Sequence, residues 1–222
     1  MHRIYDNDET EALLLVDAEN AFNNLNRKAA IHNIKELCPP FHRYLSNTYQ
    51  LPARMIINDQ VKTDTLLSEE GSTQGDVTAM QMYAVGTRPL INTLQDQTDQ
   101  TKSQQVWYAD DSSVVGEMLE MRKWWDILNV TGPKYGYYPK PSKTILIVKD
   151  PSNLQRAHEI FDQTGVKVTT SGERHLGAVI GSPEFRAEYV NNKIARWIQD
   201  VEQLAKIAED VGALVFSAEN CP

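Results

Sequence analysis

Two short apolar segments flank a pair of adjacent aspartates, and this pattern constrains the fold more than any other feature of the sequence. Residues 106–108 and 114–115 lie almost symmetrically around Asp110-Asp111, which predicts two strands joined by a tight turn that carries both acids. Another apolar run, residues 12–17, ends on Asp17 and predicts a buried strand. If these strands are neighbours in one sheet, the carboxylates meet at one edge.

The rest of the chain alternates short helices and strands between turn residues. This alternation favours an α+β fold of the split-βαβ kind, with one antiparallel sheet and helices packed on one face. The expected elements are a helix capped by Asn24 or Asn26 and ending at Pro39-Pro40, a hairpin over 54–67 turning at Asn58-Asp59, a helix after Gly75 with a kink or break at Pro89, a helix over 117–130, a strand over 144–148, a helix over 153–163, a hairpin over 166–180 and a helical tail over 184–215.

Net charge and apolar runs narrow the class of protein. The chain has 222 residues and a net charge of −8, which alone argues against nucleic-acid binding because phosphates are neutralised by Lys and Arg. Residues 116–149 are an exception, with six basic and three acidic side chains. The longest apolar run, residues 12–16, is too short to span a membrane, and the first residues hold no signal-peptide core. We therefore expect an intracellular protein, in the nucleus or cytoplasm, without a membrane partner.

Cysteine and histidine spacing excludes several kinds of site. The chain has two cysteines, Cys38 and Cys221, and neither belongs to a CxxC pair, so a structural zinc site or a disulfide framework does not fit. The sequence also lacks the nucleophile elbow, the Rossmann glycine pattern and the P-loop. The clustered aspartates are the remaining candidates for chemistry, because converging carboxylates repel one another unless a hard cation such as Mg²⁺ lies between them. Solvated aspartates at strand ends and turns are the alternative.

Five segments then carry a resemblance to a known family. They are LLLVDAENAF (13–22), GSTQGDVTA (71–79), YADD (108–111), GYYPKPSKT (136–144) and HLG (175–177), in this order. Together they resemble the motif series of the reverse transcriptase palm, of the retrotransposon type. The resemblance implies a polymerase palm with a ferredoxin-like antiparallel sheet over residues 1–182, with the fingers largely absent, and a helical tail over residues 183–222 that begins a thumb.

The resemblance assigns roles to the acids and to one lysine. Asp17, Asp110 and Asp111 match the metal-ligand aspartates, with the backbone carbonyl of Ala18 as a further ligand. The implied cofactor is a pair of Mg²⁺ ions, for which Mn²⁺ can substitute. Lys143 matches the lysine proposed to give a proton to the departing pyrophosphate, although an exposed lysine at a strand edge explains it equally well.

Other matched positions concern nucleotide and primer. Phe22 falls where the family has an aromatic ring that excludes a 2′-hydroxyl, Gln74-Gly75 matches the dipeptide that contacts the nucleotide or the template, and Leu176-Gly177 matches the hairpin that grips the primer end. For Phe22 the alternative is a core residue that opens a helix. One departure lies at Ala79-Met80, where the family usually has Ser-Pro.

The implied activity is nucleotidyl transfer by an RNA-directed DNA polymerase, the chain being a fragment of a retroelement polyprotein. Its partners would be an RNA template, a DNA primer and deoxynucleoside triphosphates, with fingers and thumb regions supplied in cis or in trans. The alternatives are a catalytically inactive, domesticated palm remnant that acts as a binding module, and an RNA-templated RNA polymerase, which Phe22 disfavours.

Two expectations concern side chains outside the motifs. One of the adjacent residues Trp124 and Trp125 should face the core, because neighbouring positions of a helix point in different directions. Four acids should face solvent: Asp64, Glu69, Glu70 and Asp76.

Overall fold

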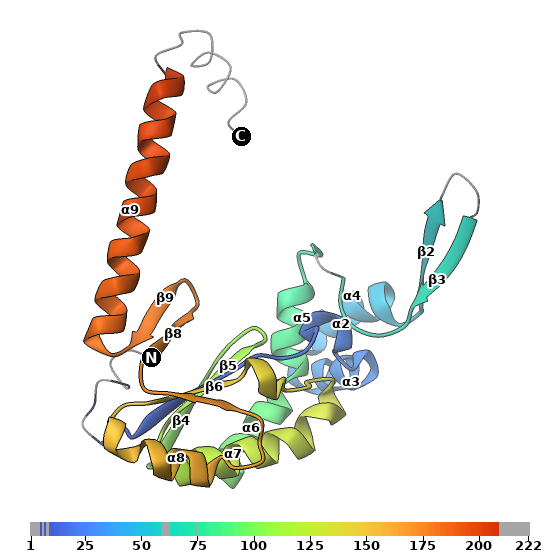
Figure 1. Cartoon of the computed structure of the whole chain (residues 1–222). Helices are drawn as coiled ribbons and strands as arrows, with labels where there is room; N and C mark the ends of the chain where they lie inside the picture. The colour runs from blue at the N-terminus through green and yellow to red at the C-terminus, as the bar shows by residue number, and fades with distance from the viewer. Residues whose placement is uncertain (1–4, 6, 8, 59–62, 74, 209–222) are drawn as a thin grey trace. The chain divides into compact units, whose positions relative to one another are not determined.

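The computed structural model of the chain describes residues 5, 7, 9–58, 63–73 and 75–208, and Figure 1 shows its elements. It divides into two compact units, residues 1–170 and residues 171–222. The division into a palm over 1–182 and a tail over 183–222 stays a prediction.

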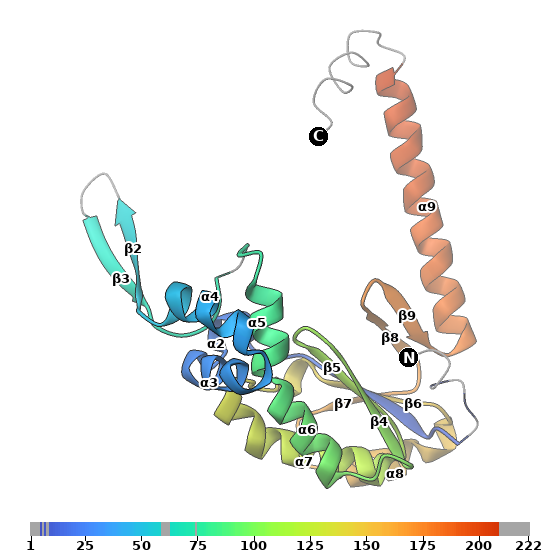
Figure 2. The same ribbon diagram turned by 180° about the vertical axis from the view of Figure 1, so that it is seen from behind.

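A five-stranded sheet forms the centre of the first unit. Its strand order is β4-β5-β1-β6-β7, and all neighbours are antiparallel except β6 and β7, which are parallel. Figure 2 shows the sheet from behind. Strand β1 is central because all its side chains are apolar and buried. The strands are β1 (Ala12–Val16), β4 (Ser103–Tyr108), β5 (Asp111–Gly116), β6 (Ile145–Val148) and β7 (Lys167–Thr169).

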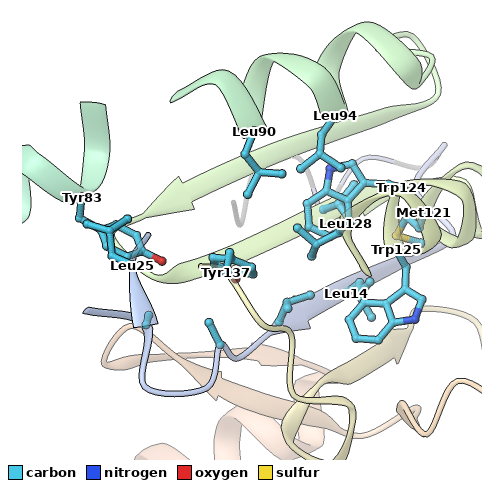
Figure 3. Close-up of a cluster of buried hydrophobic side chains, with 14 of the residues drawn as sticks. Leu14, Leu25, Tyr83, Leu90, Leu94, Met121, Trp124, Trp125, Leu128 and Tyr137 are labelled. Atoms are coloured by element: carbon cyan, nitrogen blue, oxygen red, sulfur yellow. The ribbon is translucent and has the colours of Figure 1, made fainter. Parts of the chain in front are cut away.

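Three helices cover one face of this sheet: α6 (Arg88–Gln97), α7 (Met118–Thr131) and α8 (Leu154–Ile160). Figure 3 shows the buried side chains between these layers. Trp124 and Trp125 are both in this core, so the expectation that one of them faces inward is confirmed, and the second tryptophan is buried as well. Helix α7 contacts α6, α8 and the sheet. Side chains at neighbouring positions of α7 can therefore both be buried, although they point in different directions. The predicted α+β fold, with an antiparallel sheet and helices on one face, is confirmed.

Between β1 and β4 the described residues form five helices, one of them α6, and a hairpin. Asn26 caps α3, because its side chain accepts a hydrogen bond from the Ala29 N–H at 3.0 Å. The helix ends before Pro39 as predicted, but Pro39 also starts a helix that the sequence analysis missed, since proline is tolerated in a first helical turn. The elements are α2 (Ala21–Asn24), α3 (Arg27–Leu37), α4 (Pro39–Tyr49), β2 (Ala53–Asn58), β3 (Thr63–Ser68) and α5 (Ala79–Gly86).

Two further predictions concern this segment and the loops around it. The turn expected at Asn58-Asp59 includes residues outside the described part of the chain. The break expected at Pro89 is confirmed: α5 and α6 are separate helices, and Pro89 lies in the first turn of α6. Short 3₁₀ helices occupy Gly132–Tyr135, Pro141–Lys143 and Pro151–Asn153.

The second unit contains the hairpin of β8 (Gly172–His175) and β9 (Ala178–Gly181), followed by the long helix α9 (Pro183–Ala208). The sequence pattern predicts one hairpin over 166–180, and this prediction is wrong in part. Residues 167–169 form β7 and pair with β6 in the main sheet, because Val168 can pack there beside the core. Among the described residues, no helix has the length and apolarity needed to cross a membrane.

Candidate functional site

The strand register brings Asp17 close to Asp111. Strands β1 and β5 are antiparallel, and Val16 lies opposite Ser112. Asp17 directly follows Val16, and Asp111 directly precedes Ser112. The two carboxylates therefore lie at the same end of neighbouring strands, although they are far apart in the sequence.

Asp110 lies in the turn at that end of the sheet. Tyr108 pairs with Asp111, which leaves Ala109 and Asp110 as a two-residue turn. Ala109 has a φ of 55°, a left-handed backbone conformation that costs a residue with a Cβ about 1 kcal/mol. The predicted turn between two strands is thus present, with Asp110 in it and Asp111 as the first residue of β5.

Tyr137 lies beneath this turn and is completely buried. Its hydroxyl donates a hydrogen bond to the backbone carbonyl of Asp110 at 3.0 Å and lies 2.8 Å from the Ser112 Oγ. Burial raises the pKa of Tyr137, and the negative charges of Asp110, Asp111 and Asp17 raise it further, whereas the hydrogen bond with Ser112 opposes this rise. All three predicted acids therefore lie near enough to Tyr137 to act on its charge, and this tyrosine had no role in the sequence-based predictions.

Lys143 forms an ion pair with Asp17, with 3.4 Å between Nζ and Oδ2. Backbone contacts bring the two residues together: the Lys140 N–H donates to the Asp17 carbonyl at 2.8 Å, and the Glu19 N–H donates to the Tyr138 carbonyl at 2.8 Å. Both side chains of the ion pair are partly exposed. Lys143 and Asp17 are thus far apart in the sequence but lie together at this edge of the sheet.

The donor atoms of this edge suit a hard cation, because carboxylate oxygens and the carbonyl of Ala18 are the ligand types that Mg²⁺ prefers. The types of donor atom alone do not place these atoms in an arrangement that binds a metal ion. Within the described residues, no group of three or more His, Cys, Asp or Glu side chains is placed so that it could hold a metal ion. Lys143 partly balances the charge of Asp17 instead. The pair of Mg²⁺ ions stays a prediction.

Phe22 lies in α2, immediately after the segment that holds Asp17. Its ring is half-buried and packs on Tyr83, with 4.9 Å between the ring centroids. The Phe22 carbonyl accepts a hydrogen bond from the Ser72 N–H at 2.8 Å, and the Leu25 carbonyl accepts one from the Gly71 N–H at 2.9 Å. The segment that begins at Gly71 is therefore held beside Phe22.

Of the predicted pair in this segment, Gln74 lies outside the described residues, and Gly75 has a φ of 90°. A Cβ on Gly75 would meet no atom within 4 Å. The positive φ, and not a lack of space for a side chain, thus explains why this residue is a glycine.

Leu176 and Gly177 form the turn of the β8–β9 hairpin in the second unit. Both have positive φ, 49° and 80°, as in the two-residue turns whose twist matches that of the flanking strands. A Cβ on Gly177 would meet no atom within 4 Å, so the positive φ explains the glycine. The primer-binding role stays a prediction.

A buried network behind Gly71 also escaped the sequence analysis. The Arg27 guanidinium is buried and donates hydrogen bonds to the carbonyls of Gly71, Ser68 and Glu70 at 2.9, 2.8 and 2.7 Å. It also lies 5.4 Å from the centroid of the Tyr49 ring. Arg27 thus fixes the chain where β3 leads into the segment beginning at Gly71. The sequence did not predict this role for Arg27, because a charged residue in the first turn of a helix does not by itself indicate a buried hydrogen-bond network.

Two of the four acids expected to face solvent take part in the same network. The carboxylate of Glu70, an exposed residue, accepts a hydrogen bond from the Arg27 backbone N–H at 2.9 Å. Asp76 is half-buried and accepts hydrogen bonds from the Tyr49 hydroxyl at 2.5 Å and from the Thr78 N–H at 2.7 Å. These bonds lower the pKa of Asp76, that from Tyr49 most. The solvent-facing interpretation of Asp76 is therefore wrong in part.

Comparisons with known proteins give structural neighbours only. No family model and no curated protein matches the sequence. The structure of Candida albicans telomerase in complex with the TWJ fragment of telomeric RNA matches with a TM-score of 0.60 at 10% identity, over 83% of this chain and 32% of that one. Apo telomerase from Candida tropicalis, truncated from its C-terminal domain, matches with a TM-score of 0.59 at 12% identity, over 78% and 34%.

The chain spans about a third of the length of these telomerases. At such low identity the likeness shows the fold alone. Most of the chain thus has a reverse transcriptase-like fold, shared with a region of telomerase.

Proposed function

We propose that this chain is the palm of an RNA-directed DNA polymerase of the retrotransposon type. The supporting observation is that the strand register brings Asp17 and the Asp110-Asp111 pair to one edge of the sheet, where Tyr137 bonds the Asp110 carbonyl. The likeness to telomerase supports the same class of polymerase. One of these telomerases was solved with a fragment of telomeric RNA, which agrees with an RNA template here.

In this proposal Asp17, Asp110, Asp111 and the carbonyl of Ala18 would hold two Mg²⁺ ions. The ions would supply charge neutralisation and a more acidic primer 3′-hydroxyl. Lys143, beside Asp17, is a cation that can hold a proton near the leaving pyrophosphate. The Phe22 ring excludes a 2′-hydroxyl, and Gln74-Gly75 contact the nucleotide or the template. Leu176-Gly177 hold the primer, and fingers and thumb regions complete the polymerase in cis or in trans.

One observation favours a second candidate function, a catalytically inactive palm remnant that binds a partner. The Asp17 carboxylate forms its ion pair with Lys143, and the described acids form no ready group of metal ligands. A carboxylate balanced by lysine does not need a cation to offset its charge. This candidate differs from the first in requiring no divalent metal.

Mn²⁺ binding distinguishes the two functions without requiring polymerase activity from the chain alone. We expect electron paramagnetic resonance to detect bound Mn²⁺, and the variants Asp17→Asn and Asp110→Asn to weaken binding by at least about tenfold, because each removes a charged oxygen ligand. Asp96→Asn is the matched control, since Asp96 is an exposed acid of α6. Unchanged binding in both site variants, or no binding at all, would favour the remnant.

A further inference from the structure

Helix α9 exposes a stripe of large apolar side chains. Val190, Ile194, Trp197, Val201 and Leu204 are each between 45% and 64% exposed. They belong to one long unbroken helix in the second unit. Contiguous exposed apolar surface of this kind marks an interface in soluble proteins.

The spacing of the stripe identifies the kind of partner it fits. From Val190 the side chains recur after four, three, four and three residues, and Ala187 stands three residues before Val190. Alternating steps of three and four are the a and d positions of a coiled coil, whose partner is another helix. Ala187, Ile194 and Val201 take the a positions, and Val190, Trp197 and Leu204 take the d positions. The stripe is therefore shaped for a helix packed nearly parallel or antiparallel to α9.

Two opposite charges flank the stripe on the same side. Lys193 and Asp200 are seven residues apart, so both occupy the g position. In a parallel pair of α9 helices, Lys193 would face Ile198 of the second copy and Asp200 would face Ala205, and no ion pair would form. In an antiparallel pair, Lys193 of each copy would face Asp200 of the other. The helix is thus complementary in charge to a second copy of itself in one direction only.

The core layers of the antiparallel pair are also complementary in size. With Lys193 opposite Asp200, Ala187 lies opposite Leu204, Val190 opposite Val201, and Ile194 opposite Trp197. The smallest side chain thus meets a large one, as interlocking helices require. Lys193 already lies along the stripe, with Nζ 5.2 Å from the centroid of the Trp197 ring.

We propose that α9 is a self-association element through which two copies of this chain form a two-fold symmetric, antiparallel helix pair. The surface is isologous, each copy supplying the same stripe and the same two charges. The proposal is independent of the polymerase reaction and does not involve the edge of the sheet that holds Asp17.

Charge reversal tests the proposal with the full chain. Sedimentation velocity over a range of concentrations should show a monomer–dimer equilibrium. Lys193→Asp places Asp opposite Asp, and Asp200→Lys places Lys opposite Lys, so each variant alone should associate about tenfold more weakly. An equimolar mixture of the two should regain association, because every facing pair in the mixed dimer is again of opposite charge. The controls are Gln199→Asp and Gln199→Lys, which place the same charges on the opposite side of the helix and should change nothing.

The mixture gives the decisive result. If both variants weaken association and the mixture does not restore it, the antiparallel pairing is wrong. If neither charge reversal changes the association, the interface lies on another surface and the proposal is wrong. A wild-type chain that stays monomeric at all concentrations would also overturn the proposal. Circular dichroism of each variant checks that α9 is still folded, and Trp197→Ala should weaken association without any change of charge.

Discussion

The Tyr137 hydroxyl donates a hydrogen bond to the backbone carbonyl of Asp110, 27 positions away, at 3.0 Å. A phenol has one proton, so the Ser112 hydroxyl, 2.8 Å away, is the donor in the second bond of this group. Tyr137 thus ties the turn that carries Asp110 to the segment that leads to Lys143. The positions of the candidate catalytic groups depend on this buried side chain.

Removing the Tyr137 hydroxyl should destabilise the chain and loosen the turn. Tyr137→Phe leaves the Asp110 carbonyl and the Ser112 hydroxyl without their buried partner, and an unmade buried hydrogen bond costs about 1–3 kcal/mol. Urea unfolding measures this loss, and hydrogen exchange over residues 108–112 should become faster. Tyr138→Phe is the control, because the Tyr138 side chain is exposed. Equal stability of the two variants would contradict the role given to Tyr137.

Lys143→Ala should separate a chemical role from a structural one. Both side chains of the pair with Asp17 are partly exposed, so the free energy of unfolding should change by no more than about 0.5 kcal/mol. Mn²⁺ affinity should rise or stay the same, since a competing cation is removed from Asp17, whereas primer extension by a chain completed with fingers and thumb should fall. Lys140→Ala, which removes the neighbouring pair with Glu19, should leave extension unchanged. A loss of Mn²⁺ binding in Lys143→Ala would disagree with this assignment.

Phe22→Ala should relax the choice of sugar if its ring lies beneath the nucleotide. The variant loses the contact with Tyr83 and should cost about 1–2 kcal/mol in stability, because the ring is only half-buried. GTP should then compete with a fluorescent deoxynucleotide nearly as well as dGTP does. Phe41→Ala removes a half-buried ring of α4 that stacks on Tyr44 and should leave discrimination intact. Unchanged discrimination in Phe22→Ala would remove the sugar-selecting role.

The Asp76 carboxylate should make stability depend on pH in the acid range. Hydrogen bonds from Tyr49 and Thr78 lower its pKa below the ordinary value of 3.8. A carboxyl whose pKa is lower in the folded state contributes stability above its unfolded pKa and loses it as the pH falls through the folded pKa. The difference in unfolding free energy between the native chain and Asp76→Asn should therefore be larger at about pH 7 than at about pH 3. A constant difference, or one that grows in acid, would refute this.

Local patterns in the sequence predicted much of the fold. The apolar run before Asp17 is a buried strand, the acids at 110 and 111 follow a strand end, and the proline at 89 marks the start of a new helix. Each of these follows from the chemistry of a few neighbouring residues. Local patterns did not predict the helix that begins at Pro39, because a proline that ends one helix is equally suited to begin the next.

Contacts across long stretches of chain were not predictable in this way. Both tryptophans of α7 are buried because helices from distant parts of the sequence lie on either side of it. Arg27 is buried because three carbonyl groups and the Ser68 hydroxyl, some 40 residues further along the chain, accept the hydrogen bonds of its guanidinium. Residue type alone predicts an exposed arginine, and only the surrounding acceptors offset the cost of burying its charge.

By itself, the sequence determined which residues can carry chemistry: Asp17, Asp110, Asp111 and Lys143 are distinguished by type and by the segments around them. The tertiary structure decided how these groups meet. The register of β1 on β5 places Asp17 beside Asp111, the Tyr137 hydroxyl holds the Asp110 turn, and Lys143 reaches Asp17. Strand pairing and burial are properties of the whole packed chain, because they depend on partners that no local segment contains.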